Sequence, residues 1–211
     1  KAAEGVEFFI SMLPASRHVE GLYLTPDADG KTLLDRIARS TVVIDCSTIS
    51  PQSARKVADA ARARGIDMVD APVSGGTAAA TGGTLTFMVG CREQDFAEME
   101  EALKPMAKAI IRAGDAGAGQ AAKICNNMLL GISMIATCEA FVLAERLGLD
   151  AQKFFDIASK ASGQCWSLTS YCPWPGPVPA APSNRDYEGG FAAAMMLKDL
   201  RLAQEAAMSV G

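Results

Sequence analysis

Histidine is almost absent from this chain of 211 residues, in which His18 is the single example. A Ser-His-Asp or Cys-His mechanism would have to depend on that residue, and its neighbours favour a surface or helix-capping role. The six cysteines show no C-x-x-C spacing, and several lie in apolar patterns. We therefore expect reduced core cysteines, with neither disulfides nor a metal site.

Basic runs and long apolar runs are missing as well. The formal net charge is -4 with the two signs interspersed, so we expect no nucleic-acid partner. The most apolar segment, 128–138, is shorter than the ~20 residues that span a bilayer, and Glu139 interrupts it. We expect a buried helix there and no membrane partner. Glu4 and Glu7 break any signal-peptide pattern. The scattered cysteines favour a reducing compartment, and we expect a cytoplasmic protein, or a mitochondrial matrix protein in a eukaryote.

Strand and helix patterns alternate between residues 7 and 114. Ser50 before Pro51 has the form of a capped helix start. The predicted strands are 8–12, 41–45, 68–70, 84–89 and 109–111. The predicted helices are 16–22, 31–38, 51–64 and 94–107. Such alternation predicts an α/β domain with a mostly parallel sheet covered by helices.

After Gly119 the pattern is helical only, with predicted helices at 120–147, 151–160 and 190–210. We therefore predict an incomplete Rossmann-like domain at 1–118, followed by an all-helical substrate and dimerisation domain at 119–211. A proline-rich loop at 172–183 separates the last two helices, next to Tyr171 and containing Trp174. A functional loop and a packed surface loop both fit this composition.

The segment GAGQAAKICNN at 117–127 opens the longest helix with two glycines. Lys123 and Asn127 are four residues apart, so both side chains project from the same face of a helix. An ammonium partly removed from water loses its proton more easily, which suits a lysine to acid/base chemistry. We take Lys123 and Asn127 as the candidate catalytic residues. The alternative is an exposed lysine at a helix start with no catalytic role.

The same segment matches a second motif, because Gly117, Gly119 and Ala122 satisfy the loose G-x-G-x-x-G/A pattern of dinucleotide sites. That fingerprint requires a parallel strand after the helix and an acidic residue near the end of that strand. Here more helix follows, and Glu139 falls in mid-helix. We interpret the glycines as a tight entry to a catalytic helix and keep the fingerprint as the less favoured alternative.

The motif DAPVSGG at 70–76 lies just beyond a predicted strand, where open α/β sheets bind ligands. Ser74, Gly75 and Gly76 could hold a substrate carboxylate through a hydroxyl and converging backbone N–H groups, although an ordinary turn also fits. The strand ends at 12–14 and 46–49 could line a cofactor or simply end strands. Lys198 and Asp199, taken alone, indicate a solvated charged patch.

Together these segments resemble the β-hydroxyacid dehydrogenase family over nearly the whole chain. The resemblance rests on MLP at 12–14, DCSTI at 45–49, DAPVSGG at 70–76, GAGQAAKICNN at 117–127 and KDL at 198–200. It implies that Lys123 is the general acid/base and that Asn127 positions the substrate. It also implies that Ser74, Gly75 and Gly76 bind the carboxylate. For NAD, the implied contacts are Leu13, Pro14, Thr48, Phe191 and Lys198.

The resemblance implies an NAD-dependent oxidoreductase that takes hydride from a small hydroxy acid. The first candidate is 3-hydroxyisobutyrate, which would give methylmalonate semialdehyde in valine breakdown. The alternatives are a tartronate semialdehyde reductase, an inactive fragment, or a non-catalytic binding module on the same scaffold.

Members of the family begin with a strand, a Gly-rich loop and a helix, and they continue beyond the last helix found here. We therefore expect the Gly-rich segment and the C-terminal end to be missing from this chain. The long apolar helix at 120–147 also leads us to expect a homodimer or homotetramer through the helical domain.

Overall fold

The computed structural model describes residues 2–211, which divide into two compact units. Unit 1 contains residues up to 125 together with 201–211, and unit 2 contains 126–200. The strands are β1 Phe8–Ser11, β2 Val42–Asp45, β3 Met68–Asp70, β4 Val73–Ser74, β5 Leu85–Gly90 and β6 Ala107–Gly114. The α-helices are α1 Ser16–Leu24, α2 Pro51–Arg62, α3 Gly76–Thr81, α4 Phe96–Leu103, α5 Ala118–Arg146, α6 Ala151–Ala158, α7 Trp166–Thr169 and α8 Ala193–Val210. The functional division at residues 118 and 119 stays a prediction.

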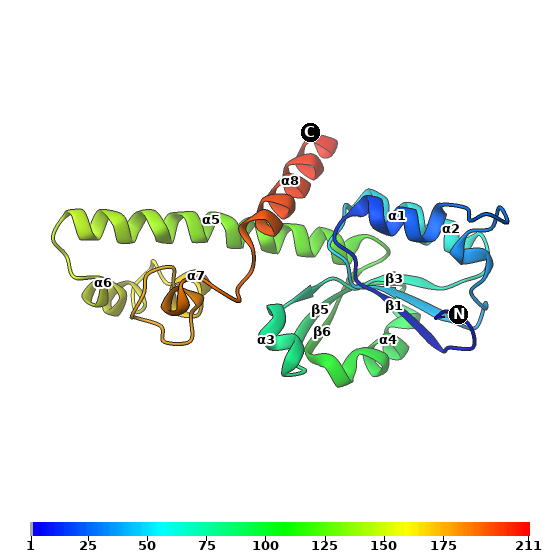
Figure 1. The fold of residues 1–211 in the computed structure, drawn as a ribbon, viewed down its shortest axis with the longest axis horizontal. Coiled ribbons are helices and arrows are strands. Elements are labelled where there is room, and N and C mark those ends of the chain that lie inside the picture. Colours follow the sequence, from blue (N-terminus) through cyan, green and yellow to red (C-terminus); the bar gives the residue numbers. More distant parts are fainter. Residues whose placement is uncertain (1) are drawn as a thin grey trace. The chain divides into compact units, whose positions relative to one another are not determined.

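The strands of unit 1 form one sheet with helices on both of its faces (Figure 1). The order is β1-β2-β3-β5-β4, and β6 pairs with β5. The pairs β1/β2, β2/β3 and β5/β6 are parallel, whereas β5 runs antiparallel to β3 and β4. The predicted α/β fold with a mostly parallel sheet is confirmed.

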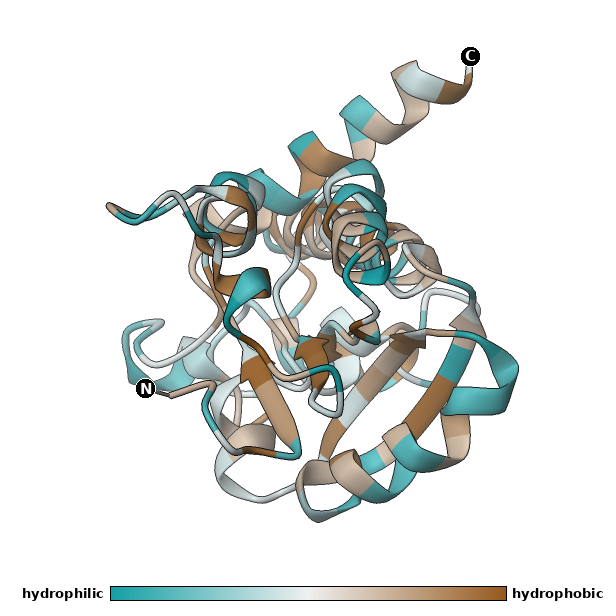
Figure 2. Cartoon of the chain, turned by 90° about the vertical axis from the view of Figure 1, so that its right-hand side faces the viewer, coloured by the Kyte–Doolittle hydropathy of each residue, from teal (hydrophilic) through white to brown (hydrophobic). Residues whose placement is uncertain are grey.

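Strand β2 shows how the sequence builds two apolar layers. All four of its residues are buried, as expected for a strand covered on both faces. Val43 packs in the cluster that includes Val57 of α2, whereas Ile44 packs in the cluster that includes Leu103 of α4. In Figure 2 the strands are among the most hydrophobic segments of the unit, and hydrophilic residues follow the outer helices and loops.

The helix start at Ser50 is confirmed: its side chain accepts a hydrogen bond from the backbone N–H of Ser53 at 3.0 Å, and Pro51 occupies the first helical position. The predicted helix at 31–38 is wrong, because only the 3-10 turn Leu33–Asp35 forms there. The carboxylate of Asp35 closes that turn on Thr32 in a capping box, and β2 begins seven residues later at Val42.

The strands β1, β2 and β3 form one parallel group, β5 and β6 form another, and the two groups meet at their carboxyl ends. Gly90, the last residue of β5, pairs with Asp70 at the end of β3 and with Gly114 at the end of β6. Helix α5 begins four residues after Gly114. Its first turn is therefore placed at the edge where open α/β sheets bind ligands.

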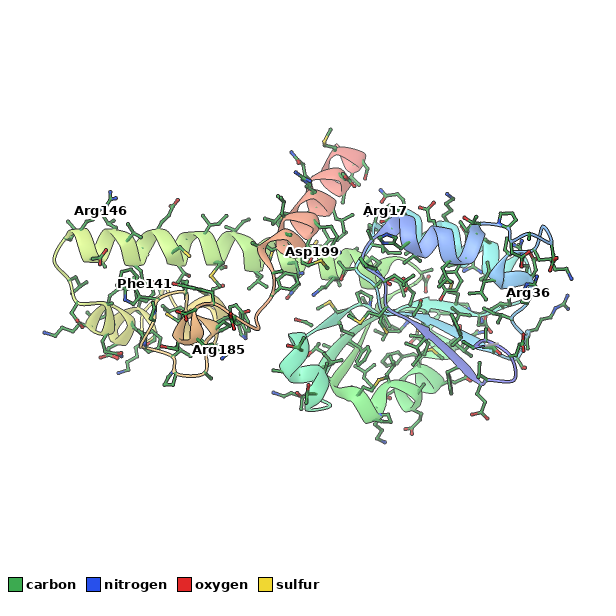
Figure 3. All side chains as sticks on the ribbon, viewed as in Figure 1. Arg17, Arg36, Phe141, Arg146, Arg185 and Asp199 are labelled. Carbon is green, nitrogen blue, oxygen red and sulfur yellow. The ribbon has the colours of Figure 1, made fainter. Side chains whose placement is uncertain are left out.

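Unit 2 is helical and has a core of its own around Phe141 of α5. The Phe141 ring contacts Phe154 of α6 edge-on at 4.9 Å and stacks on Trp174 at 5.6 Å between centroids. Figure 3 labels Phe141 on this helix. The Ser183 hydroxyl donates to the Cys172 carbonyl at 2.7 Å, which closes the proline-rich loop. The loop is thus packed through its aromatic residue.

Helix α5 corrects two expectations. Its central apolar residues are largely exposed, so the predicted buried helix at 128–138 is wrong. By length and composition alone, α5 is long and apolar enough to cross a membrane, and the core helices of globular proteins pass the same test. Only 28% of its most apolar 18-residue window is buried in this structure. Cys125 and Cys138 are exposed on it, so they are not core residues, although all six cysteines are unpaired. The residue pattern predicted that a long helix forms here, but it did not predict which face of that helix is buried.

Candidate active site

The buried carboxylate of Asp70 holds the first turn of α5 against the sheet. Its Oδ1 accepts the N–H of Gly117 at 2.7 Å, and its Oδ2 accepts the N–H of Gln120 at 2.9 Å. A carboxylate at a helix N-terminus binds N–H groups that lack helical partners and meets the positive end of the helix dipole. Burial nevertheless raises the pKa of Asp70 to about 6, against the opposing effect of these two hydrogen bonds.

The glycines around this turn allow a close approach of backbone to backbone. A Cβ on Gly119 would lie 2.3 Å from the carbonyl oxygen of Met88 and 2.8 Å from Oδ2 of Asp70. A Cβ on Gly90 would lie 2.3 Å from Oδ1 of Asp70. No strand follows α5 in the described residues 118–211. The glycines therefore form a tight entry to the helix, and the alternative dinucleotide fingerprint does not fit.

Gln120 ties the same turn to the loop after β2. Its side chain is fully buried at 0% exposure. Its Oε1 accepts the N–H of Ile49 at 3.0 Å, and its Nε2 donates to the carbonyl of Ser47 at 2.8 Å. One amide therefore binds both peptide groups that flank Thr48.

Ser47 extends this network to the loop after β1. Its hydroxyl donates to Oδ1 of Asp45 at 2.6 Å and accepts the N–H of Leu13 at 2.7 Å. Ser11 donates to the same Asp45 oxygen at 2.7 Å. Burial raises the pKa of Asp45 despite these hydrogen bonds. The loops carrying Leu13 and Thr48 are thus fixed to each other and to the helix start.

Lys123 follows one turn after Gln120 and is only 8% exposed. Asn127 follows one turn later on the same continuous helix, so the two candidate catalytic residues share a helix face, as predicted from their spacing. In unit 2, the Asn127 amide donates to Oδ2 of Asp199 at 2.5 Å. Lys198 forms an ion pair with Oδ1 of Asp199 at 3.0 Å. Asp199 is 2% exposed, so the solvated charged patch expected there is wrong.

The other predicted residues lie at two separate places. Ser74 ends β4, paired with Thr86 of β5, and the backbone then turns through Gly75 at φ +132° and Gly76 at φ +65° into α3. A Cβ on Gly75 would lie 2.4 Å from that of Ala79, so the turn admits only glycine there. Phe191 in unit 2 is half exposed, and its N–H donates to the Tyr171 hydroxyl at 2.7 Å.

The residues at the carboxyl ends of β1 and β2 fit part of a dinucleotide. Met12 and Pro14 are exposed, Thr48 is half-buried, and the hydrogen bonds of Ser47 and Gln120 hold their loops in place. A preorganised, partly apolar surface of this kind, tied through Gln120 to the helix turn that precedes Lys123, suits a planar cofactor and an acid/base group. The fold and this arrangement together indicate a dinucleotide-binding domain of the Rossmann type with a candidate acid/base lysine.

Comparison with known proteins narrows this class. Residues 1–114 match the family model for the NAD binding domain of 6-phosphogluconate dehydrogenase. Residues 117–211 match the model for the NAD-binding domain of NADP-dependent 3-hydroxyisobutyrate dehydrogenase. The chain belongs to the β-hydroxyacid dehydrogenase family, whose members are hydroxyacid dehydrogenases that use NAD or NADP.

Two relatives from Pseudomonas aeruginosa are about equally similar. An NAD-dependent L-serine dehydrogenase is 53% identical over 99% of this chain and 68% of its own length. A 3-hydroxyisobutyrate dehydrogenase is 50% identical over 100% of this chain and 69% of its own. The solved 3-hydroxyisobutyrate dehydrogenase of Mycobacterium tuberculosis with L-serine is 47% identical, with a TM-score of 0.90 over 100% of this chain and 69% of that one. The family is settled by these similarities, and the substrate within it is not.

Four residues of the site were missed or misjudged from sequence: Asp45, Asp70, Gln120 and Asp199. Asp45 and Asp70 each end an apolar strand, where a carboxylate is buried at the ligand edge of the sheet. That position was a usable signal. Nothing local marks Gln120, because its two partners lie more than seventy residues away in the sequence.

Proposed function

We propose that this enzyme oxidises a 3-hydroxy carboxylate with NAD, and that its substrate is 3-hydroxyisobutyrate, an intermediate of valine breakdown. The observation that supports a catalytic role most directly is the placement of Lys123. Its side chain is nearly buried, one turn beyond a helix start that is hydrogen-bonded to Asp70 at the end of β3 and to the loop after β2. Lysine is rarely buried to this degree, so this placement favours a functional role.

The mechanism assigns one task to each part of this chain. NAD, when bound, supplies the acceptor for the hydride that leaves the carbinol carbon. The neutral amine of Lys123 accepts the proton of the substrate hydroxyl, and Asn127 holds that hydroxyl in place. Ser74 and the backbone of Gly75 and Gly76 bind the carboxylate. The product is the corresponding semialdehyde, here methylmalonate semialdehyde.

L-Serine is the second candidate substrate, because a relative named for its oxidation is as similar to this chain as one named for 3-hydroxyisobutyrate. The two molecules share a primary alcohol and a carboxylate, and they differ in a methyl or an ammonium group on the carbon between them. The lysine and the carboxylate loop serve both. Discrimination therefore depends on the side chains that face that one group.

Initial rates of NADH formation test the proposal, with 3-hydroxyisobutyrate, L-serine and glycerate compared at equal enzyme concentration and with NADP as a parallel cofactor. We expect the highest kcat/KM for 3-hydroxyisobutyrate with NAD. A higher value for L-serine would reassign the substrate, and a higher value for glycerate, the alcohol that corresponds to tartronate semialdehyde, would move the enzyme to the tartronate semialdehyde branch. Lys123→Ala should abolish turnover while dinucleotide binding persists; retained turnover would refute the assigned role.

A second copy of the chain is the partner that we propose for the exposed face of α5. Met128, Ile132, Ile135 and Val142 are exposed on it at intervals of four, three and seven residues. Such intervals form the apolar seam of paired helices. A seam this long on one element suits a symmetric interface.

A further inference from the structure

We propose that Gln120 is a positioning residue, which holds the dinucleotide-lining loop after β2 in register with the helix that carries Lys123. This inference rests on the acid/base role proposed for Lys123. It extends that role by naming the group that fixes the distance between the amine and the bound cofactor.

The bonding of Gln120 is specific to its side chain. The oxygen and the nitrogen of its amide are each used once, on the two peptide groups that flank Thr48. A glutamate at this position has no donor for the Ser47 carbonyl, a methionine has neither polar group, and an asparagine is one methylene shorter. The side chain is fully buried, so water does not replace a lost hydrogen bond.

The two ends of this bridge lead to the two halves of the proposed site. On the loop side, Ser47 also binds the N–H of Leu13, so one connected network holds both strand-end loops. On the helix side, the N–H of Gln120 is bound by Asp70, and Lys123 lies three residues later on the adjacent turn. A shift of the loop against this turn would move the cofactor relative to the amine. Misplacement by about 1 Å costs on the order of 100-fold in rate.

The test compares Gln120→Met with a matched variant, Thr41→Val, in the full-length natural protein. Thr41 also buries its side chain and donates to one backbone carbonyl, that of Val6, but at the opposite end of β2. We expect Q120M to raise KM for NAD and lower kcat, by about 10- to 100-fold in kcat/KM. T41V should lower the midpoint of urea unfolding and leave both kinetic constants within about 2-fold.

Further readouts separate positioning from mere stability. If Q120M shifts only the unfolding midpoint, as T41V does, the inference is overturned. If Q120M does not fold, Gln120→Asn replaces it, because it keeps both polar groups without adding a charge but is one methylene too short to reach both partners. A value of kcat/KM for Q120N equal to that of the wild type would then overturn the inference. Lys123→Ala is measured alongside. If K123A loses turnover and the Gln120 variant does not, only the positioning role of Gln120 is refuted. If K123A retains turnover, the proposed function itself is refuted.

Discussion

The amide of Asn127 donates a hydrogen bond of 2.5 Å to a carboxylate oxygen of Asp199, and both side chains are buried. If Asn127 positions the substrate, as proposed, Asp199 acts through Asn127 and not on the substrate directly. Lys198, a predicted cofactor contact, forms an ion pair with the other oxygen of Asp199. A single carboxylate thus orients two residues of the proposed site.

Replacing Asp199 tests this arrangement. Asp199→Ala leaves the Asn127 amide without its acceptor, and we expect a loss of about 2 kcal/mol in unfolding free energy together with a fall in kcat/KM of about 10-fold or more. Asp199→Asn keeps an oxygen that can accept from Asn127, so it should recover a large part of the activity. Steady-state kinetics and urea unfolding measure both. Equal activity in D199A and the wild type would contradict the positioning role.

Asp70 gives a pH dependence of known sign. Its pKa is 3.8 in the unfolded reference state and about 6 in the folded protein, where burial raises it. Between pH 3.8 and about 6 the folded state therefore binds more protons than the unfolded state. The stabilising contribution of Asp70 is fully present below pH 3.8 and is lost as the pH rises through about 6. The contribution amounts to roughly 3 kcal/mol.

Urea unfolding of the wild type and Asp70→Asn at several pH values isolates this effect. Other carboxylates, such as Glu20 beside Lys56, have lowered pKa values and act in the opposite direction, but they are common to both proteins. The stability of the wild type relative to D70N should fall by roughly 3 kcal/mol between about pH 3 and pH 7. A difference that stays constant over this range would show that Asp70 does not titrate as described.

Local features such as helix caps were predicted correctly from the sequence, whereas the burial of several residues was not. The N-cap at Ser50 and the entry glycines follow from backbone chemistry within a few residues, and both are found as expected. The exposure of α5 and the burial of Asp199 depend on segments far away in the chain, so an apolar run and a charged pair were each assigned to the wrong environment. Gln120 was missed for the same reason.

Gly119 should tolerate no side chain. In Gly119→Ala the new Cβ would clash with the backbone carbonyl of Met88 and with the carboxylate of Asp70. The first group is backbone and the second is held by hydrogen bonds, so neither can move aside by rotating a flexible side chain. We expect a loss of about 3 kcal/mol or more in unfolding free energy and a fall in activity. Gly21→Ala is the matched control: Gly21 lies inside α1, a Cβ there meets nothing within 4 Å, and alanine should stabilise by about 0.5–1 kcal/mol. Thermal unfolding of both variants measures the contrast.

The exposed seam of α5 predicts both an assembly and its orientation. Glu139 is exposed in the same seam, between Ile135 and Val142, so a parallel pair of copies would set Glu139 against its equivalent. Like charges directly opposed are destabilising, which leaves the antiparallel pair favoured. We therefore expect Ile132→Glu to weaken self-association by about 30-fold or more in Kd, because it removes an apolar contact and adds charge.

Light scattering after size exclusion measures this for the full-length natural protein over a range of concentrations. Leu22→Glu is the control, because Leu22 is a half-exposed leucine of α1 outside the seam, and it should leave the mass unchanged. Glu139→Leu should have the opposite effect to I132E, since it removes the one charge between two apolar contacts. A wild-type protein that stays monomeric at every concentration would mean that something other than a second copy covers the seam.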